Sequence, residues 1–292
     1  MEGEDTEAMY HFRQAYIKEI SGDIDGAILE LEKGTEGKAP QSVYMKLVEL
    51  YLEEKYYEKA LVKINMLLSV NPRNKEFRTM KIRTLKLMER FYEAYEEYEK
   101  ILEQFPNEPE NYLNEAEFLT EAGKLDEALS KIKRAVMLNP EDPELHIKEA
   151  EVLLEKERVD EAIECVTKAI SYAPCIPDYY VLAGKLLDET GRFDDGEKYL
   201  IRAAEIRPHD LMILQDICEH FERKGDLHSA IVYYDKLIDL NPYEASFFFE
   251  RGTLKEEMNN KAAAMEDYGK ALTLDPENPQ YSGRAKKLEG RA

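Results

Sequence analysis

Apolar and polar residues follow one another along this chain with the period of an amphipathic α-helix, in stretches that are interrupted at regular intervals. In GKLDEALSKIKRAVMLNP and GDLHSAIVYYDKLIDLNP, a turn is followed by apolar residues three and four positions apart and then by Asn-Pro. This spacing places the apolar side chains on one side of a helix, and Asn-Pro ends the helix. The pattern predicts a series of helices that each bury one face.

Proline positions give the period of this pattern. Seven prolines stand 34 residues apart, and the other five fall within three residues of the same junctions. Proline inside a helix costs about 3 kcal/mol, so all twelve are interpreted as turns between repeats. The seven are Pro72, Pro106, Pro140, Pro174, Pro208, Pro242 and Pro276. We expect repeats over residues 8–40, 41–74, 75–108, 109–142, 143–176, 177–210, 211–244 and 245–278.

Residue size follows the same period. When the proline is counted as position 32, position 20 is small in all eight copies and position 8 is small in six. Two helices approach closely only where neither carries a bulky side chain, so each copy is predicted to be an antiparallel helical hairpin. Val48 and Ile82 are large at position 8, and the hairpins of the second and third copies are expected to be splayed. Glycine at position 15 is expected to end the first helix at Gly22, Gly123, Gly191 and Gly225.

With these features the chain resembles the tetratricopeptide repeat family, whose 34-residue unit has small residues at positions 8, 20 and 27 and proline at position 32. Position 27 follows the family at Ala135, Ala169, Ala203 and Ala271. The resemblance covers residues 8–278. It implies an all-α fold, a right-handed solenoid that forms one domain over residues 1–292. Residues 279–292 are expected to form a capping helix, with Tyr281, Ala285 and Leu288 on the last apolar face.

Composition narrows the function. The chain carries 40 Lys and Arg against 61 Asp and Glu, a net charge of −21, so it would repel a nucleic-acid backbone over most of its surface. The absence of a run of about 18 apolar residues argues against a membrane span, and the acidic first segment argues against a signal peptide. Cys165, Cys175 and Cys218 form no CxxC pair and are interpreted as reduced thiols. A cytoplasmic protein is expected.

No group of residues in the sequence points to catalysis. Glycine-rich phosphate loops, nucleophile motifs and paired histidine spacings for a metal are all missing. His146 occupies position 4, which is aromatic in other copies, and is interpreted as a packing residue. A zinc site that combines His220 and His228 with Cys218 is the alternative to a packing role there. We expect no enzyme activity, no cofactor and no metal.

In arrays that this chain resembles, positions 2, 5, 9 and 12 of the first helices line a concave groove. Here this stripe holds twelve acidic and three basic side chains, whereas a stripe at positions 19, 22, 23 and 26 of the second helices holds ten acidic and eleven basic. A wall of one sign attracts an oppositely charged ligand. We expect a basic, partly apolar partner segment, with a solvated face and a site elsewhere as the alternative. The candidate groove residues are Glu49, Arg83, Lys86, Leu113, Asn114, Glu117, Ile147, Lys148, Glu151, Lys185, Glu219 and Phe249.

Residues 73–90 have the opposite sign, with seven Lys and Arg against two Glu. Two interpretations remain open: pairing with acidic neighbouring helices such as EEYEKILE, or a site for an acidic tail. The family includes a carboxylate clamp for the acidic tails of chaperones, and its register falls on Thr79, Arg83, Asn114, Glu144 and Lys148. Only Asn114 matches, and Glu144 inverts one charge, so tail binding of this kind is not expected.

These observations predict a non-catalytic scaffold or adaptor that binds a protein or peptide segment. Two alternatives remain. The chain could be a self-associating assembly module, because residues 1–7 are too few to mask the first copy well. It could also be the regulatory subunit of a separate enzyme, as the resemblance allows. The partner, its pathway and the oligomeric state are left open.

Overall fold

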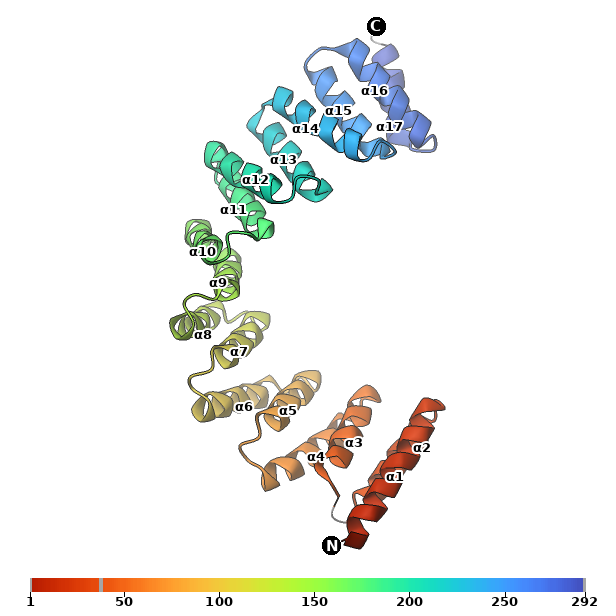
Figure 1. The fold of residues 1–292 in the computed structure, drawn as a ribbon, viewed down its shortest axis with the longest axis vertical. Helices are drawn as coiled ribbons and strands as arrows, with labels where there is room; N and C mark the ends of the chain where they lie inside the picture. The colour runs from red at the N-terminus through yellow and green to blue at the C-terminus, as the bar shows by residue number, and fades with distance from the viewer. Residues whose placement is uncertain (1, 37–38, 291–292) are drawn as a thin grey trace. The chain divides into compact units, whose positions relative to one another are not determined.

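The computed structural model describes residues 2–36 and 39–290. These residues form seventeen α-helices and no strand, arranged as eight helical hairpins and a last helix (Figure 1). The chain divides into two compact units, of which the first ends at Phe118 and the second begins at Leu119. The all-α repeat fold expected from the sequence is confirmed.

The helices follow the proline period. The first helices of the hairpins are α1 (Glu2–Ile20), α3 (Gln41–Glu53), α5 (Lys75–Leu87), α7 (Pro109–Glu121), α9 (Pro143–Glu155), α11 (Pro177–Glu189), α13 (Leu211–Lys224) and α15 (Ala245–Glu257). The second helices are α2 (Ile24–Gly34), α4 (Tyr57–Val70), α6 (Phe91–Gln104), α8 (Leu125–Leu138), α10 (Val159–Tyr172), α12 (Phe193–Ile206), α14 (Leu227–Leu240) and α16 (Lys261–Leu274), and α17 (Pro279–Glu289) follows them. From α3 onward, every first helix begins at the first residue of its repeat. Only α1 begins earlier, six residues before Ala8.

Small residues at positions 8 and 20 lie where the two helices of a hairpin meet. In the sixth hairpin, a Cβ on Gly184 would lie 2.6 Å from Cγ of Leu200, and a Cβ on Gly196 would lie 3.0 Å from the carbonyl oxygen of Gly184. Where position 8 is larger, at Val48 and Ile82, the two helices of the hairpin meet over less of their length than α11 and α12 do. The more open packing expected for the second and third hairpins is therefore present.

The first helix of each hairpin ends at a residue with a left-handed backbone. Position 15 has a positive φ in all eight copies, with glycine at the four places expected from the sequence. The other four residues are not glycine and have φ between 57° and 61°: Lys55, Glu89, Glu157 and Asn259. Only glycine adopts this conformation without a steric cost. The packing of the two helices therefore imposes the same turn on residues that do not favour it.

Side chains at position 4 tie each first helix to the junction before it. The carbonyl of the position-32 proline follows the end of a helix and has no partner within that helix. In four consecutive copies this carbonyl accepts a hydrogen bond from the position-4 side chain. His146 is one of the four, in agreement with the packing role expected for it. The four pairs are Arg78 Nη2 with Pro72 (2.7 Å), Tyr112 Oη with Pro106 (3.1 Å), His146 Nε2 with Pro140 (2.8 Å) and Tyr180 Oη with Pro174 (3.1 Å).

Within the second unit, the first helices form one layer and the second helices form another (Figure 1). The helices α11 and α13 contact each other directly, whereas α12 packs on α13 and α14 packs on α15. Neighbouring first helices are thus close, and grooves open between neighbouring second helices. At the end of the unit, α17 buries Tyr281 and Leu288, and Ala285 packs beside Leu288.

Candidate partner-binding surface

The candidate groove residues of the first unit lie on α3, α5 and α7. Three of them are exposed, and three are half-buried. The exposed ones are Glu49, Arg83 and Glu117, and the half-buried ones are Lys86, Leu113 and Asn114. The ammonium of Lys86 lies 5.8 Å from the centre of the Phe118 ring, so part of its charge faces an aromatic surface.

The basic stretch at residues 73–90 is largely neutralised inside the first unit. Glu97 of α6, which is buried, receives Arg78 at 2.6 Å and Lys81 at 3.0 Å. Glu108 lies 2.7 Å from Lys75, and Glu93 lies 2.6 Å from Arg90. Glu97 belongs to the acidic segment EEYEKILE, so pairing with α6 accounts for three of the seven basic side chains, and Glu108 accounts for a fourth. An acidic tail would therefore find few unpaired cations here.

In the second unit, the basic candidates are also engaged. Lys148 lies 2.9 Å from Glu151 on the same helix, and Lys185 of α11 lies 2.5 Å from Asp216 of α13. These pairs cancel both cations of this face and also Glu151. The acidic candidate that keeps its charge is Glu219, which is exposed on α13.

Two apolar candidates have structural roles. Ile147 is 8% exposed and belongs to the core of the ninth helix, so the interpretation of this side chain as groove surface is corrected by its burial. The ring of Phe249 lies 4.8 Å from that of Tyr281 and 5.5 Å from that of Tyr268, and thus packs against the capping helix. Within the second unit, Met212 is an exposed apolar side chain on this face. It lies seven residues before Glu219 on α13, which is two helical turns.

A cluster of carboxylates lies on α13 and α15. Burial raises the pKa of Glu222 above its ordinary value, and the negative charges of Glu250, Glu257 and Glu219 raise it further, against a hydrogen bond of 2.9 Å from Tyr234 Oη. The charges of the other three carboxylates therefore act against the charged form of Glu222. Glu219 and Glu222 belong to the acidic stripe read from the sequence. Glu250 and Glu257, at positions 6 and 13, were missed, although their seven-residue spacing places them on one face of α15.

The register of the carboxylate clamp finds no support within either unit. Glu144, which takes the place of a lysine, accepts a hydrogen bond from the hydroxyl of Tyr179, and this contact together with burial raises the pKa of Tyr179. Lys148 is paired with Glu151, as described above. At these positions, the described part of the second unit therefore has no pair of unengaged cations that could bind a carboxylate.

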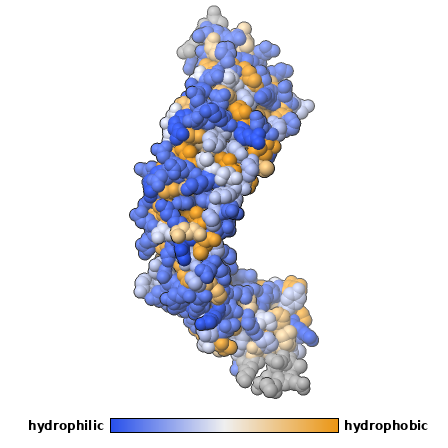
Figure 2. All heavy atoms as spheres, turned by 60° about the vertical axis from the view of Figure 1, so that its left-hand side comes forward, coloured by the Kyte–Doolittle hydropathy of each residue, from blue (hydrophilic) through white to orange (hydrophobic). Residues whose placement is uncertain are grey.

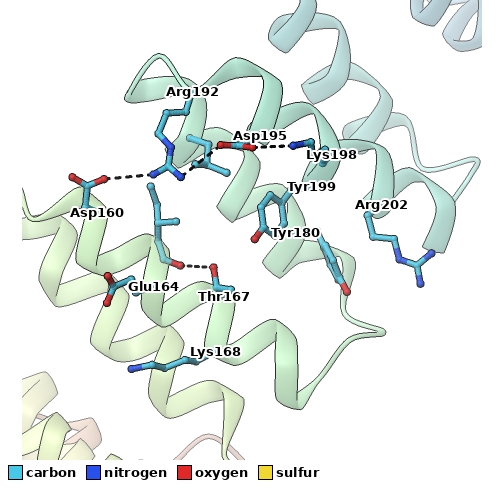
Figure 3. Close-up of a pocket in the computed structure, with 12 residues that line it drawn as sticks. Asp160, Glu164, Thr167, Lys168, Tyr180, Arg192, Asp195, Lys198, Tyr199 and Arg202 are labelled. Atoms are coloured by element: carbon cyan, nitrogen blue, oxygen red, sulfur yellow. Dashed lines mark hydrogen bonds and ion pairs between the residues drawn. The ribbon is translucent and has the colours of Figure 1, made fainter.

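Sequence reasoning missed a cavity of the second unit. A groove of about 1100 Å³ lies between α10 and α12, over Tyr180 and Leu187 of α11 (Figure 3). The rings of Tyr180 and Tyr199 are 6.2 Å apart in it. Arg192 lies 3.7 Å from both Asp160 and Asp195, and Lys198 lies 3.0 Å from Asp195. Its charges are thus mostly paired.

A second groove of about 480 Å³ repeats this arrangement between α12 and α14, over Leu214 of α13. Lys236 stands 3.9 Å from the ring centre of Tyr233 at its wall. Figure 2, which brings the outer side of the second unit forward, shows mainly hydrophilic residues there, with smaller hydrophobic patches between them. The residues at positions 19, 22, 23 and 26 of the sixth copy all line the larger groove, so a periodic signal was available: Asp195, Lys198, Tyr199 and Arg202.

The buried cysteines, Cys165 and Cys218, and the buried His220 serve packing. Burial raises the pKa of the Cys165 thiol to about 12 and also raises that of Cys218, so both are held as thiols. Buried His220 lies with Nδ1 2.8 Å from Asp188, and His228 is exposed on another helix. Among residues 2–36 and 39–290, no group of three metal-ligating side chains comes together. No helix in the same residues has the length and apolar character needed to cross a membrane.

The fold and its surfaces define a helical-repeat protein whose hairpins present broad helical faces. Two models of the tetratricopeptide repeat match the chain, one over residues 85–146 and 119–186 and the other over residues 177–210 and 245–278. The chain belongs to the tetratricopeptide repeat family. The comparison with curated proteins gave no match.

Solved structures show the same fold. The C-terminal part of a TPR repeat-containing protein from Cytophaga hutchinsonii is 14% identical, with a TM-score of 0.66 over 82% of this chain and 98% of that one. YrrB, described as a TPR protein with an unusual peptide-binding site, is 23% identical, with a TM-score of 0.52 over 65% of this chain and 97% of that one. At these identities the likeness extends to the fold alone.

Proposed function

We propose that this protein is a non-catalytic scaffold that holds a basic, partly apolar segment of a partner protein on the first-helix face of its second unit. A tetratricopeptide repeat array is a protein-interaction module. The observation that carries the finer proposal is the carboxylate cluster of Glu219, Glu222, Glu250 and Glu257, in which burial and then the charges of the other three raise the pKa of Glu222. A cationic partner would relieve this repulsion, so binding and the state of the cluster are coupled.

The surroundings of the cluster support a partner that is also partly apolar. Met212 is 76% exposed on the same face of α13 as Glu219, and Val181 and Phe249 are half-buried on the neighbouring first helices. Lys185 and Lys148 are already paired with carboxylates, so they offer no competing attraction for an acidic ligand. The net charge of −21 supports proteins over nucleic acids as partners, and the cytoplasm remains the proposed location.

The test uses two labelled probe peptides, one of alternating lysine and leucine and one of alternating glutamate and leucine. The full chain should bind the lysine peptide, and the affinity should fall as salt rises. Glu219→Gln with Glu257→Gln removes two exposed charges of the cluster and should weaken binding about threefold to tenfold, mainly through slower association.

The matched control is Glu164→Gln with Glu266→Gln, which removes two exposed carboxylates from second helices of the same unit. Glu164 also lines the groove between α10 and α12, so this variant tests that groove as the alternative binding site at the same time. Equal losses in both double variants would contradict the proposal. Tighter binding of the glutamate peptide would contradict it as well. That result would favour the cations of the groove between α10 and α12 as the binding site.

A further inference from the structure

The outer side of α4 differs from that of the other second helices at one position of the repeat. Position 26 carries a lysine or an arginine in seven of the eight hairpins: Lys33, Lys100, Arg134, Lys168, Arg202, Lys236 and Lys270. In the second hairpin this residue is Met66, and its side chain is 46% exposed. A large apolar side chain therefore faces solvent where the other hairpins place a cation.

Met66 belongs to an apolar stripe along α4. Val62 and Val70 stand four residues before and four residues after it, and they are 58% and 86% exposed. Residues four apart lie on the same side of a helix, so the three side chains form one stripe. The other exposed residues between Val62 and Val70 are Asn65 and Ser69, which are uncharged. In a chain in which 35% of the residues are charged, this stripe is a surface that water solvates poorly.

The stripe leads into a cavity of the first unit, where α4 packs against α3 and α5 (Figure 1). The cavity has a volume of about 480 Å³, and Met66 and Val70 line it together with Tyr44 of α3 and the buried Phe77 of α5. Every lining residue that the structure describes is uncharged. The cavity can therefore enclose a large side chain, and its lining favours an apolar one.

Two cations stand beside this uncharged surface. The ammonium of Lys63 lies 5.7 Å from the ring centre of Tyr44 and 3.1 Å from the hydroxyl oxygen of Thr35. Arg73 is exposed and follows the lining residue Asn71 by two positions. Within the described ranges of the chain, no carboxylate forms an ion pair with either cation. An acidic side chain of a ligand would therefore meet positive charge beside the cavity.

We propose that α4 and this cavity bind an amphipathic helix of a partner protein, which places a large apolar side chain beside Met66 and a carboxylate near Lys63. A helix suits the surface because its apolar side chains recur at three- and four-residue steps, which is the spacing of the stripe. Methionine adapts its shape to such a ligand. A cation at position 26 would lose hydration under the same ligand, so the site is confined to the second hairpin.

The probe is a labelled peptide of about 18 residues, which is long enough to form a helix. It is built on alanine and glutamine, with leucines at three- and four-residue steps and glutamates beside them. Fluorescence anisotropy measures its binding to the full chain. Met66→Lys gives α4 the residue type of the other hairpins and should weaken binding about tenfold, because the ammonium resists burial in the apolar contact. Circular dichroism should show unchanged helicity.

The control is Val232→Lys, which changes an apolar side chain that is 52% exposed on α14 of the second unit. This variant should bind the probe as the wild type does. Lys63→Gln should weaken binding of the glutamate probe about threefold and should not affect a probe with glutamine in place of each glutamate. A general loss of stability would weaken the binding of both probes alike.

A chain that does not bind the leucine probe overturns the proposal, and so does binding that Met66→Lys leaves unchanged. A wild type that dimerises in sedimentation equilibrium, with a dimer that Met66→Lys dissociates, assigns the surface to a second molecule of this chain and overturns the proposal as well. The alternating peptides that probe the carboxylate cluster cannot place their leucines on one side of a helix, so the two proposals fail separately.

Discussion

The third and sixth hairpins place different chemistry at the same positions of the repeat. At positions 4 and 23 the third hairpin joins Arg78 to Glu97 by a buried ion pair of 2.6 Å, whereas the sixth places the rings of Tyr180 and Tyr199 6.2 Å apart. The ion pair ties α5 to α6 on the flank of the hairpin. The tyrosine pair instead borders the groove of about 1100 Å³ between α10 and α12. The same two positions of the repeat thus hold an ion pair between the helices in one hairpin and aromatic residues of a groove in the other.

The same two hairpins also differ where their helices cross. The sixth has glycine at both contact positions, and its backbones meet directly at Gly184 and Gly196. The third has Ile82, which is buried, opposite Ala94, and α5 and α6 meet over a shorter length. Close approach is therefore one solution of the hairpin and not a requirement. A hairpin that gives up backbone contact is held by side-chain packing and buried charge instead.

The largest expected effect concerns the ion pair of the third hairpin. Glu97→Ala removes the carboxylate that holds Arg78 and Lys81, and the charge of Arg78 is left buried without a counter-charge, with only the Pro72 carbonyl as a hydrogen-bond acceptor. Loss of one member of a buried pair typically costs 3–5 kcal/mol, and partial solvent access of Lys81 places the expected loss at about 3 kcal/mol. Denaturant unfolding followed by circular dichroism measures it. Glu93→Ala on the same helix, which breaks the exposed pair with Arg90, should cost much less, because solvent screens that pair.

The same carboxylate gives the third hairpin an acid dependence at its buried ion pair. Burial raises the pKa of Glu97, but hydrogen bonds from Lys100 and Lys81 outweigh it and leave the pKa below its ordinary value of 4.5. Because the folded pKa is the lower one, its contribution is complete above pH 4.5 and is lost as pH falls through the folded value. Hydrogen exchange of α5 and α6 should rise in acid in the wild type and change less in Glu97→Gln. An unchanged acid response in that variant would show that Glu97 is not the group responsible.

The next effect concerns the glycine contact of the sixth hairpin. Gly184→Ile gives α11 the residue that the third hairpin tolerates, but its Cβ would meet Leu200 at 2.6 Å and the carbonyl oxygen of Gly196 at 3.2 Å. Overpacking of this kind typically costs 1–3 kcal/mol, and about 2 kcal/mol is expected. Gly269→Ile on α16 is the control, since a Cβ there meets nothing within 4 Å. Equal unfolding midpoints of the two variants would show that the sixth hairpin can open as the third does.

The smallest effect concerns the turns of the two hairpins. Position 15 is Glu89 with φ of 57° in the third hairpin and Gly191 with φ of 74° in the sixth. A left-handed conformation costs a residue with a side chain about 1–2 kcal/mol, and the greater freedom of unfolded glycine offsets part of the gain. Glu89→Gly should therefore stabilise the chain by about 0.5–1 kcal/mol, and Gly191→Glu should destabilise it by a similar amount. Thermal unfolding measures both, and the same sign of change in both variants would refute the role of φ.

Most of the helix boundaries were predictable from the sequence because proline acts locally. Its ring excludes the preceding helical hydrogen bond wherever it stands, so Pro109, Pro143 and Pro177 each begin a helix in the structure as the period required. The left-handed turns at Lys55 and Glu157 were not predictable, since these residues favour other conformations and adopt this one because of the helices on either side. The start of α1 before Ala8 was not predicted either, because no proline precedes Ala8 to mark the beginning of the helix.

The candidate site was predictable only as a helix face. Position within a helix follows from the 3.6-residue period, so Glu219 and Glu222 could be placed together from spacing alone. Which charges remain unpaired could not be read in this way, because Lys185 is neutralised by Asp216 on the next first helix and Lys81 by Glu97 on the partner helix. Such pairs depend on the angle between two helices and on the reach of each side chain.

The sequence by itself determined the repeat length, the number of hairpins, the acidic first-helix face and the residues at which backbones can touch. These features depend on backbone sterics and on helical periodicity, which act over a few residues. The tertiary structure decided which hairpins open, which basic residues are neutralised, where the outer grooves form and that Met66 and Val70 border a cavity. Each of these depends on what a neighbouring hairpin places opposite a given side chain, and no local pattern along the chain records that.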